Sequence, residues 1–214
     1  YFITDGYTVL PLVSVANYKF FKDGEGFYAD GVASYAPNYN ISEVVISRIT
    51  NIANNIIQYF DKNGIPYKGI IGIEGVLNGE DRFLVTGLKP FFRDFDVRNI
   101  LNLLEEDLLI LFNSCINASF SDIYSEIKTN NFSSASVVVY SDYAGEIIEG
   151  LERIEDRDNI DIMKAGCDND KLTACKGGCF SLTRSAATLS KAKSDLYEDL
   201  AEISFKGIYY RKSV

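Results

Sequence analysis

A long amphipathic segment constrains the fold of this chain more than any other feature of the sequence. Between residues 42 and 62, apolar side chains recur at helical spacing, so one face of the segment must be buried. Ser42 predicts the start of a helix, because its hydroxyl can accept hydrogen bonds from the first free amides. Gly64 predicts its end. The chain therefore contains a helix that needs an apolar surface to pack against.

Two strands follow this helix directly. Residues 67–73 and 82–88 are expected to be extended, and the Asn78-Gly79 pair between them is a strong hairpin signal. A helix beside an antiparallel hairpin predicts an α+β fold rather than an all-helical or all-strand one.

The remaining segments are less regular. The cluster of Ser, Asn and Asp at 119–134 predicts a linker, which divides the chain into a domain over 1–118 and a second over 135–214. We further expect a loop over 22–40, helices over 97–118 and 189–203, and strands over 7–13, 135–140, 160–165 and 207–211. A tight turn is expected at 176–178.

Composition narrows the possible partners. The 214 residues are 47% hydrophobic, which is enough for a sizeable core, and the net charge is −9. An acidic chain is a poor partner for nucleic acid or an anionic membrane surface. No apolar run approaches the roughly 18 residues that span a bilayer. We expect a cytoplasmic protein that binds neither nucleic acid nor membrane.

The sequence contains no histidine. This excludes Ser-His and Cys-His nucleophile pairs and histidine-ligated metals within the chain. The four cysteines lack the Cys-x-x-Cys pairs of a zinc ribbon, and we expect reduced, buried thiols. They are Cys115, Cys167, Cys175 and Cys179.

The first residue is Tyr1 rather than Met. Residues 1–6 read as a strand that runs into a turn, so we expect a piece of a longer protein. A cleaved leader is the alternative.

Seven segments, in order along the chain, resemble marks of glycinamide ribonucleotide synthetase (phosphoribosylamine–glycine ligase), a family of ATP-grasp ligases. The resemblance runs end to end and implies the back half of an ATP-grasp domain, an antiparallel sheet with helices. A small β-rich C-terminal domain with one helix would follow it. The segments are Thr4-Asp5-Gly6, Lys22-Asp23-Gly24, Tyr35-Ala36-Pro37, 64–69 (Gly-Ile-Pro-Tyr-Lys-Gly), Ala165-Gly166, Gly177-Gly178 and 205–212.

The stretch from Val85 to Asp96 departs from that family where its chemistry lies. Such a ligase joins glycine to phosphoribosylamine with ATP and Mg²⁺, and its metal ligands include a Glu and an Asn. Here Gly87 and Lys89 stand in their places. A lysine opposes a bound cation, and Mg²⁺ needs oxygen ligands at fixed geometry. We therefore predict no catalytic residue and no metal site, and ATP and Mg²⁺, implied only by the resemblance, are not expected to bind to this chain alone.

The glycine-rich loop of the family is also altered. Tyr28, Ala29 and Asp30 replace residues that the resemblance would assign to phosphate binding, which leaves Gly26 and Gly31 as the nucleotide-binding candidates. Further along, Lys164 and Cys179 stand where the family has a His and an Arg. These changes all weaken nucleotide contacts.

Four residues are substrate-binding candidates by the same resemblance: Asp94, Asp96, Gly177 and Gly178. Each has a plainer alternative. The two acids could hold a metal or a substrate amine, or could simply complement the dipole of the following helix. The glycine pair could simply form a hairpin turn.

Three other residues have similar alternatives. Lys89 could bind phosphate or be an exposed loop lysine. Tyr28 and Tyr35 could stack on a base or pack in the core.

Two functions follow from the sequence. The first is the C-terminal part of a divergent phosphoribosylamine–glycine ligase of purine biosynthesis. It would bind small-molecule substrates only once the missing N-terminal and ATP-grasp portion, in cis or in another chain, completes it. The alternative is a pseudoenzyme, a non-catalytic ATP-grasp remnant that acts as an assembly or regulatory module within a purine enzyme.

Overall fold

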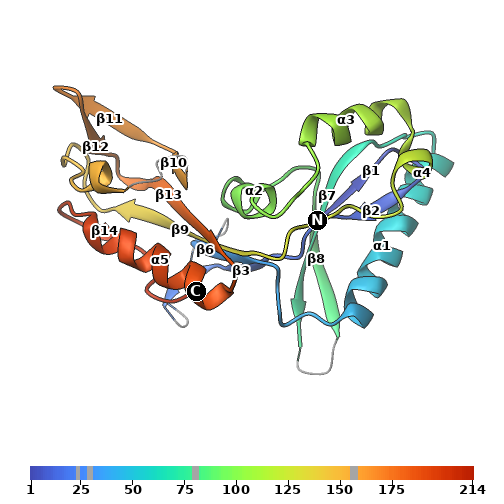
Figure 1. Cartoon of the computed structure of the whole chain (residues 1–214), viewed down its shortest axis with the longest axis horizontal. Helices are drawn as coiled ribbons and strands as arrows, with labels where there is room; N and C mark the ends of the chain where they lie inside the picture. The colour runs from blue at the N-terminus through green and yellow to red at the C-terminus, as the bar shows by residue number, and fades with distance from the viewer. Residues whose placement is uncertain (23–24, 28–30, 79–81, 155–158) are drawn as a thin grey trace. The chain divides into compact units, whose positions relative to one another are not determined.

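The computed structural model describes residues 1–22, 25–27, 31–78, 82–154 and 159–214, which form two compact units (Figure 1). Each unit collects several stretches of the chain. Unit 1 comprises residues 1–14, 37–93 and 103–130, and unit 2 comprises residues 15–36, 94–102 and 131–214.

Unit 1 is built on a four-stranded antiparallel sheet in the order β2-β1-β7-β8. The strands are β1 (Phe2–Thr4), β2 (Val9–Pro11), β7 (Gly69–Leu77) and β8 (Phe83–Lys89). The predicted hairpin is confirmed as β7 and β8, although residues 79–81 of its turn lie outside the described part of the chain.

Helix α1 (Glu43–Lys62) covers this sheet, as its apolar stripe predicts. The Ser42 hydroxyl accepts a hydrogen bond from Val45 N at 3.4 Å, and Gly64 has φ +68° just beyond the last turn. The helix buries one face against the sheet. The shared core is Phe2, Val9, Val45, Ile49, Ala53, Ile57 and Ile71.

The continuous helix predicted over 97–118 is wrong. The chain instead forms α2 (Asp94–Leu101), in unit 2, and α3 (Leu108–Asn117), in unit 1. The second helix starts anew because the Asp107 carboxylate accepts hydrogen bonds from Leu109 N and Ile110 N at 2.7 and 3.3 Å. A short helix, α4 (Phe120–Ile123), lies within the predicted linker.

Unit 2 is built on an antiparallel sheet in the order β10-β13-β9-β6-β3, with β14 also pairing with β9. Its strands are β3 (Ala16–Tyr18), β6 (Ala33–Ala36), β9 (Ser133–Ser141), β10 (Ile160–Ile162), β13 (Gly177–Ala186) and β14 (Ile208–Tyr209). Two hairpins add β4 (Phe20–Lys22) with β5 (Glu25–Phe27), and β11 (Ala165–Asp168) with β12 (Lys171–Ala174). A 3₁₀ turn spans Leu151–Arg153.

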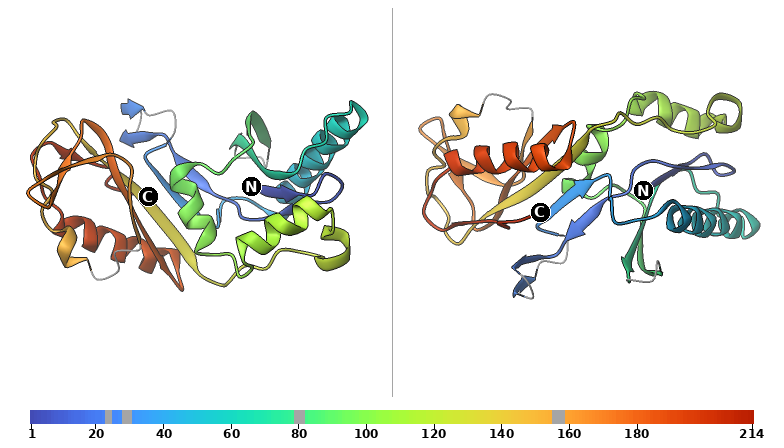
Figure 2. Two further views of the ribbon diagram at one scale, coloured as in Figure 1. Left: turned by 90° about the horizontal axis from the view of Figure 1, so that it is seen from above. Right: turned by 60° about the horizontal axis from the view of Figure 1, so that its bottom comes forward.

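Strand β9 is buried along its whole length because helices cover both of its faces. Helix α5 (Leu189–Glu202), which Thr188 caps through a hydrogen bond from Lys191 N, packs across one face (Figure 2). Ala135, Val137 and Val139 contribute to the apolar core of unit 2, to which α5 also belongs. Val138 and Tyr140 belong to a separate cluster with Phe95 of α2.

Two further expectations need correction. The loop predicted over 22–40 contains β6, all four residues of which are buried between β3 and β9. The strand predicted over 160–165 is interrupted, because β10 pairs with β13 whereas β11 pairs with β12.

The predicted domain division stays a prediction. The compact units cut the chain differently, since 15–36 and 94–102 join the C-terminal segment in unit 2. No helix in the described ranges combines the length and the apolar character needed to cross a membrane.

Candidate functional site

The stretch from Val85 to Asp96 divides between a strand and a helix. Strand β8 ends at Lys89, a four-residue connection follows, and α2 begins at Asp94. Lys89 is the last residue of the strand rather than part of a loop. Its ammonium lies 5.9 Å from the centre of the Phe91 ring.

Gly87 faces a carboxylate on the neighbouring strand. In the β7–β8 register, Glu74 stands directly opposite Gly87. A Cβ added to Gly87 would lie 3.2 Å from Glu74 Oε2. The acid absent from β8 therefore has a counterpart on β7, which the sequence did not reveal because the predicted strand ended at residue 73.

This carboxylate is already neutralised. The Arg93 guanidinium forms an ion pair with Glu74, and the two side chains are only 8% and 23% exposed. Arg93 N also donates to the Tyr1 hydroxyl at 3.4 Å. Breaking this ion pair is energetically costly, because removal of the guanidinium would leave a desolvated carboxylate without a partner.

The residues on this face do not fit a magnesium ion. Gly72, Glu74, Gly87 and Lys89 alternate onto one face of the hairpin, with Gly72 opposite Lys89. They offer one carboxylate, which Arg93 already pairs. Mg²⁺ requires free oxygen ligands around the ion. In the described ranges, no three acidic or cysteine side chains come together in a way that could hold a metal ion.

Asp94 and Asp96 occupy the first turn of α2. Asp94 is exposed, whereas Asp96 is 3% exposed and accepts a hydrogen bond from Asn17 Nδ2 at 3.2 Å. Residues two apart on a helix point in different directions. The structure therefore separates the two predicted acids, and both lie where they complement the helix dipole.

Gly26 makes room for an aromatic ring of the chain itself. It has φ +64°, and a Cβ there would lie 2.8 Å from Phe21 Cδ2. The Phe21 ring in turn meets the Tyr140 ring edge-on, with the centroids 4.9 Å apart. The neighbouring candidates Tyr28, Ala29 and Asp30 lie outside the described residues.

Gly31 contacts the same group of side chains. A Cβ at this position would lie 2.5 Å from Asn17 Oδ1, and the Gly31 carbonyl accepts from the Tyr140 hydroxyl at 3.4 Å. Asn17 also donates a hydrogen bond to Asp96. One asparagine therefore lies beside Gly31, which was predicted to bind nucleotide, and contacts Asp96, which was predicted to bind substrate.

The glycine pair does not form a hairpin turn. Gly177 and Gly178 lie in β13, where they pair with Ser141 and Tyr140 of β9. A Cβ at Gly178 would touch Tyr140 at 3.5 Å. Gly26, Gly31 and Gly178 thus all approach Tyr140, directly or through Phe21. They accommodate packing around a tyrosine of this chain.

The other candidates are also part of the core. Tyr35 is buried, and burial raises its pKa, with Tyr18 adding to the rise. Cys179 is fully buried, and burial likewise raises the pKa of its thiol. Its Sγ lies 3.1 Å from the Cys175 carbonyl, so the thiol donates locally.

A buried polar network, which the sequence did not reveal, holds α2 to the sheet. Asn99 donates to the Ser34 hydroxyl at 2.9 Å, and its carbonyl accepts from Ser134 and Ser136 at 2.7 and 3.0 Å. Ser136 and Thr183 share a further hydrogen bond of 2.6 Å. A serine-rich strand beside a helix that carries Asn is the only signal, and nothing in the spacing shows that they meet.

Comparison with known proteins shows which of them this chain resembles. No family model matches the chain. The phosphoribosylamine–glycine ligase of Caldanaerobacter subterraneus subsp. tengcongensis is 26% identical over 217 residues, which cover 98% of this chain and 51% of that protein. The trifunctional purine biosynthetic protein adenosine-3 of Gallus gallus is 28% identical over 221 residues, or 99% of this chain and 22% of that protein.

The chain is homologous to phosphoribosylamine–glycine ligase. Its fold agrees, since the crystal structure of the Thermotoga maritima phosphoribosylamine–glycine ligase superposes with a TM-score of 0.81 at 18% identity. That match covers 99% of this chain and 53% of the other. The chain spans about half the length of the phosphoribosylamine–glycine ligases that it matches. The α+β fold and the ATP-grasp resemblance predicted from the sequence are confirmed.

Proposed function

We propose that this chain is a scaffold portion of a divergent phosphoribosylamine–glycine ligase that does not bind Mg-ATP by itself. The observation that carries the proposal is the Glu74–Arg93 ion pair, which faces Gly87 across the β7–β8 hairpin. A guanidinium and the Lys89 ammonium lie where a divalent cation would need free carboxylates.

The packing around Tyr140 supports the same proposal. Glycines near phosphate allow a ligand to approach the backbone closely. Here Gly26 and Gly31 are close to the side chains of Phe21 and Asn17 instead. We therefore propose that Gly26 and Gly31 serve packing within this chain rather than nucleotide binding.

Two roles within a larger cytoplasmic ligase are consistent with this proposal. The similarity across the whole length of this chain supports the first, in which another segment or chain supplies ATP and substrate binding. The second is a non-catalytic assembly or regulatory module in a purine enzyme. The matching part of the Gallus gallus protein lies within a longer trifunctional chain, so a segment of this kind does occur inside a larger purine biosynthetic protein.

Isothermal titration calorimetry with ATP and MgCl₂ tests the proposal. We expect no saturable heat for this chain, which corresponds to a dissociation constant weaker than about 1 mM. The full-length Thermotoga maritima ligase is the positive control, and ATP with EDTA is the blank. Binding in the micromolar range that depends on Mg²⁺ would overturn the proposal.

A further inference from the structure

The turn between β12 and β13 brings two of the four cysteines together. Cys175 follows β12 directly, and Cys179 lies in β13, with residues 176–178 between them. The Cys179 Sγ lies 3.1 Å from the Cys175 carbonyl oxygen and 3.6 Å from the Gly177 carbonyl oxygen. The turn therefore folds back over the sulfur of Cys179.

These contacts limit the distance between the two cysteines. With the Cys175 oxygen 3.1 Å from the Cys179 Sγ, standard bond lengths place the two Cα atoms within about 8 Å of each other. A disulfide needs Cα atoms about 4.4–6.8 Å apart. The pair is therefore in that range, or outside it by no more than about 1.5 Å.

The turn has the freedom to make such an adjustment. Gly177 has φ +102°, and within the described ranges no atom lies within 4 Å of the place where its Cβ would be. The pairing of β13 with β9 shifts register between Gly178 and Phe180, which leaves Cys179 at a β-bulge. Two glycines and a bulge allow the backbone to move here without breaking a regular ladder.

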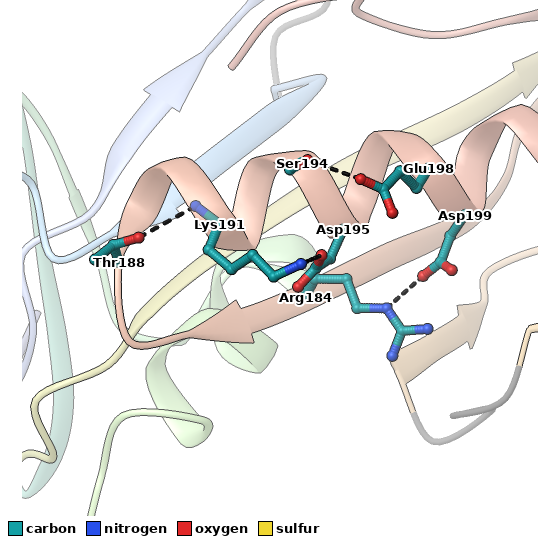
Figure 3. A network of polar contacts seen from close by, with 7 residues as sticks. All are labelled: Arg184, Thr188, Lys191, Ser194, Asp195, Glu198 and Asp199. Atoms are coloured by element: carbon teal, nitrogen blue, oxygen red, sulfur yellow. Dashed lines mark hydrogen bonds and ion pairs between the residues drawn. The ribbon is translucent and has the colours of Figure 1, made fainter.

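The far end of β13 is held by α5. Arg184, near the end of the strand, forms an ion pair with Asp199 of the helix (Figure 3). Cys179 belongs to the same apolar core as Leu196 and Leu200 of α5. A disulfide at Cys179 would therefore join an adjustable turn to a strand that the helix holds in place.

The two thiols differ in their access to solvent. Cys179 is fully buried, whereas Cys175 is partly exposed. Burial raises the pKa of the Cys179 thiol, and the hydrogen bond to the Cys175 carbonyl partly offsets that rise. An oxidant in solution therefore meets Cys175 first, and Cys179 lies beside it as the second thiol.

Neither of the other cysteines is placed to react with Cys175. Cys167 lies on β11 opposite Leu172, which is three residues before Cys175 in the chain. At about 3.3 Å per residue, this separation is roughly 10 Å, which a disulfide does not span. Cys115 is buried within α3 of unit 1.

We propose that Cys175 and Cys179 form a reversible disulfide when the chain meets hydrogen peroxide. The Cys175 sulfur, after losing its proton, attacks one peroxide oxygen. An S–O bond forms, the O–O bond breaks, and the departing hydroxide takes up that proton as water. The Cys179 sulfur then loses its proton and attacks the Cys175 sulfur. The S–S bond forms, the S–O bond breaks, and a second water leaves.

The electrons balance in this sequence. The two thiols are oxidised to one disulfide, and one hydrogen peroxide is reduced to two waters. The modification site is independent of the proposed function and of the Glu74–Arg93 pair.

Peroxide treatment of the folded chain, followed by mass spectrometry without reduction, tests the proposal. Trypsin cuts after Lys176, so the two cysteines fall on separate peptides, 172–176 and 177–184. We expect these peptides to be recovered as a linked pair that has lost two hydrogens. Dithiothreitol should return them to the separate thiol forms.

Three serine variants separate the roles of the cysteines. Cys175→Ser should abolish the linked pair. Cys179→Ser should also abolish it, but should leave a sulfenic acid on Cys175 that dimedone labels, because the second thiol is missing. Cys167→Ser is the matched control, since it removes an exposed cysteine from the neighbouring hairpin, and should leave the yield of the linked pair unchanged.

Several outcomes would overturn the proposal. Circular dichroism of each variant first checks that the fold is intact. A linked peptide that joins Cys167 to Cys175, or oxidation of Cys175 to its sulfinic acid without any linked pair, contradicts it. The same mixture of linked peptides from the folded chain and from the chain in urea also contradicts it, because the fold would then select no pair. A failure here leaves the calorimetry with Mg-ATP unaffected, so the two proposals can fail separately.

Discussion

Removing either partner of the Glu74–Arg93 pair should destabilise unit 1 well beyond the loss of a surface contact. Arg93 is 8% exposed and Glu74 is 23% exposed, so both charges are largely desolvated. Breaking a buried pair costs about 3–5 kcal/mol, because the remaining charge has no partner. Glu74→Gln strands the more buried group and should cost about 3 kcal/mol. Arg93→Met strands the partly hydrated carboxylate and should cost about 2 kcal/mol, below that range, because water can reach it.

The double variant gives the decisive number. With both charges gone, neither is stranded, so Glu74→Gln with Arg93→Met should cost less than the sum of the single variants by about 2 kcal/mol. Urea unfolding followed by far-UV circular dichroism measures these free energies, since the chain contains no tryptophan.

The Arg153–Glu202 pair supplies a matched control. Its atoms lie 3.2 Å apart, but the side chains are 65% and 53% exposed. Exposed ion pairs contribute about 0–1 kcal/mol. The equivalent double-mutant cycle at Arg153 and Glu202 should therefore give a coupling energy near the lower end of that range. A coupling energy at Glu74–Arg93 that is no larger than the control would refute the view that a guanidinium is built into this face.

Three further substitutions and measurements follow from the structure. Gly150→Ala should cost more than about 3 kcal/mol, because a Cβ would lie 1.9 Å from the Glu202 carbonyl, whereas Gly145→Ala, with φ +86° but open space around it, should cost about 1 kcal/mol in thermal unfolding. Burial raises the pKa of the Cys115 thiol from 9.0 to about 11. The folding stability that comes from the protonated thiol is therefore complete below pH 9.0 and is lost as pH rises through about 11. At pH 8, mass spectrometry should find the exposed Cys167 alkylated well before the buried Cys115. Asn99→Ala should cost about 2–3 kcal/mol because it removes three buried hydrogen bonds, to Ser34, Ser134 and Ser136, and an unchanged melting temperature would contradict that role.

Elements with local signals could be predicted from the sequence. Helix α1 has its apolar stripe, its Ser42 cap and its Gly64 stop within one continuous segment, and α5 has its stripe and the Thr188 cap. The break between α2 and α3 could not be predicted, because Asp107 follows Glu105 and Glu106, and a run of acids can be either a charged interruption of one helix or the cap of the next. The cap and an interruption look alike until the backbone direction is known.

The candidate functional site could not be predicted, because it is formed by strand pairings that have no local signal in the sequence. Strand β6 was missed because Ala33 and Ser34 are small residues next to Gly31, a composition typical of a loop. Glu74 was missed because only the β7–β8 register puts it opposite Gly87, and a one-residue shift would turn it to the other face. The resemblance alone put Gly87 and Lys89 at the family's metal-ligand positions, whereas the pairing of Arg93 with the nearby Glu74 carboxylate had no signal in the sequence.

The pairing of β6 with a strand far along the chain affects how unit 2 folds and where it can be truncated. Tyr35 pairs with Ala135, 100 positions later, so β3 and β6 are synthesised long before the strand that they join. Pairing over such a separation is slow, because a long loop must close before any contact compensates for the lost chain entropy. A truncation that starts after residue 134 would remove β3, β6 and α2 together. It would leave one edge of β9 without a neighbour, and an open strand edge with an apolar surface favours aggregation.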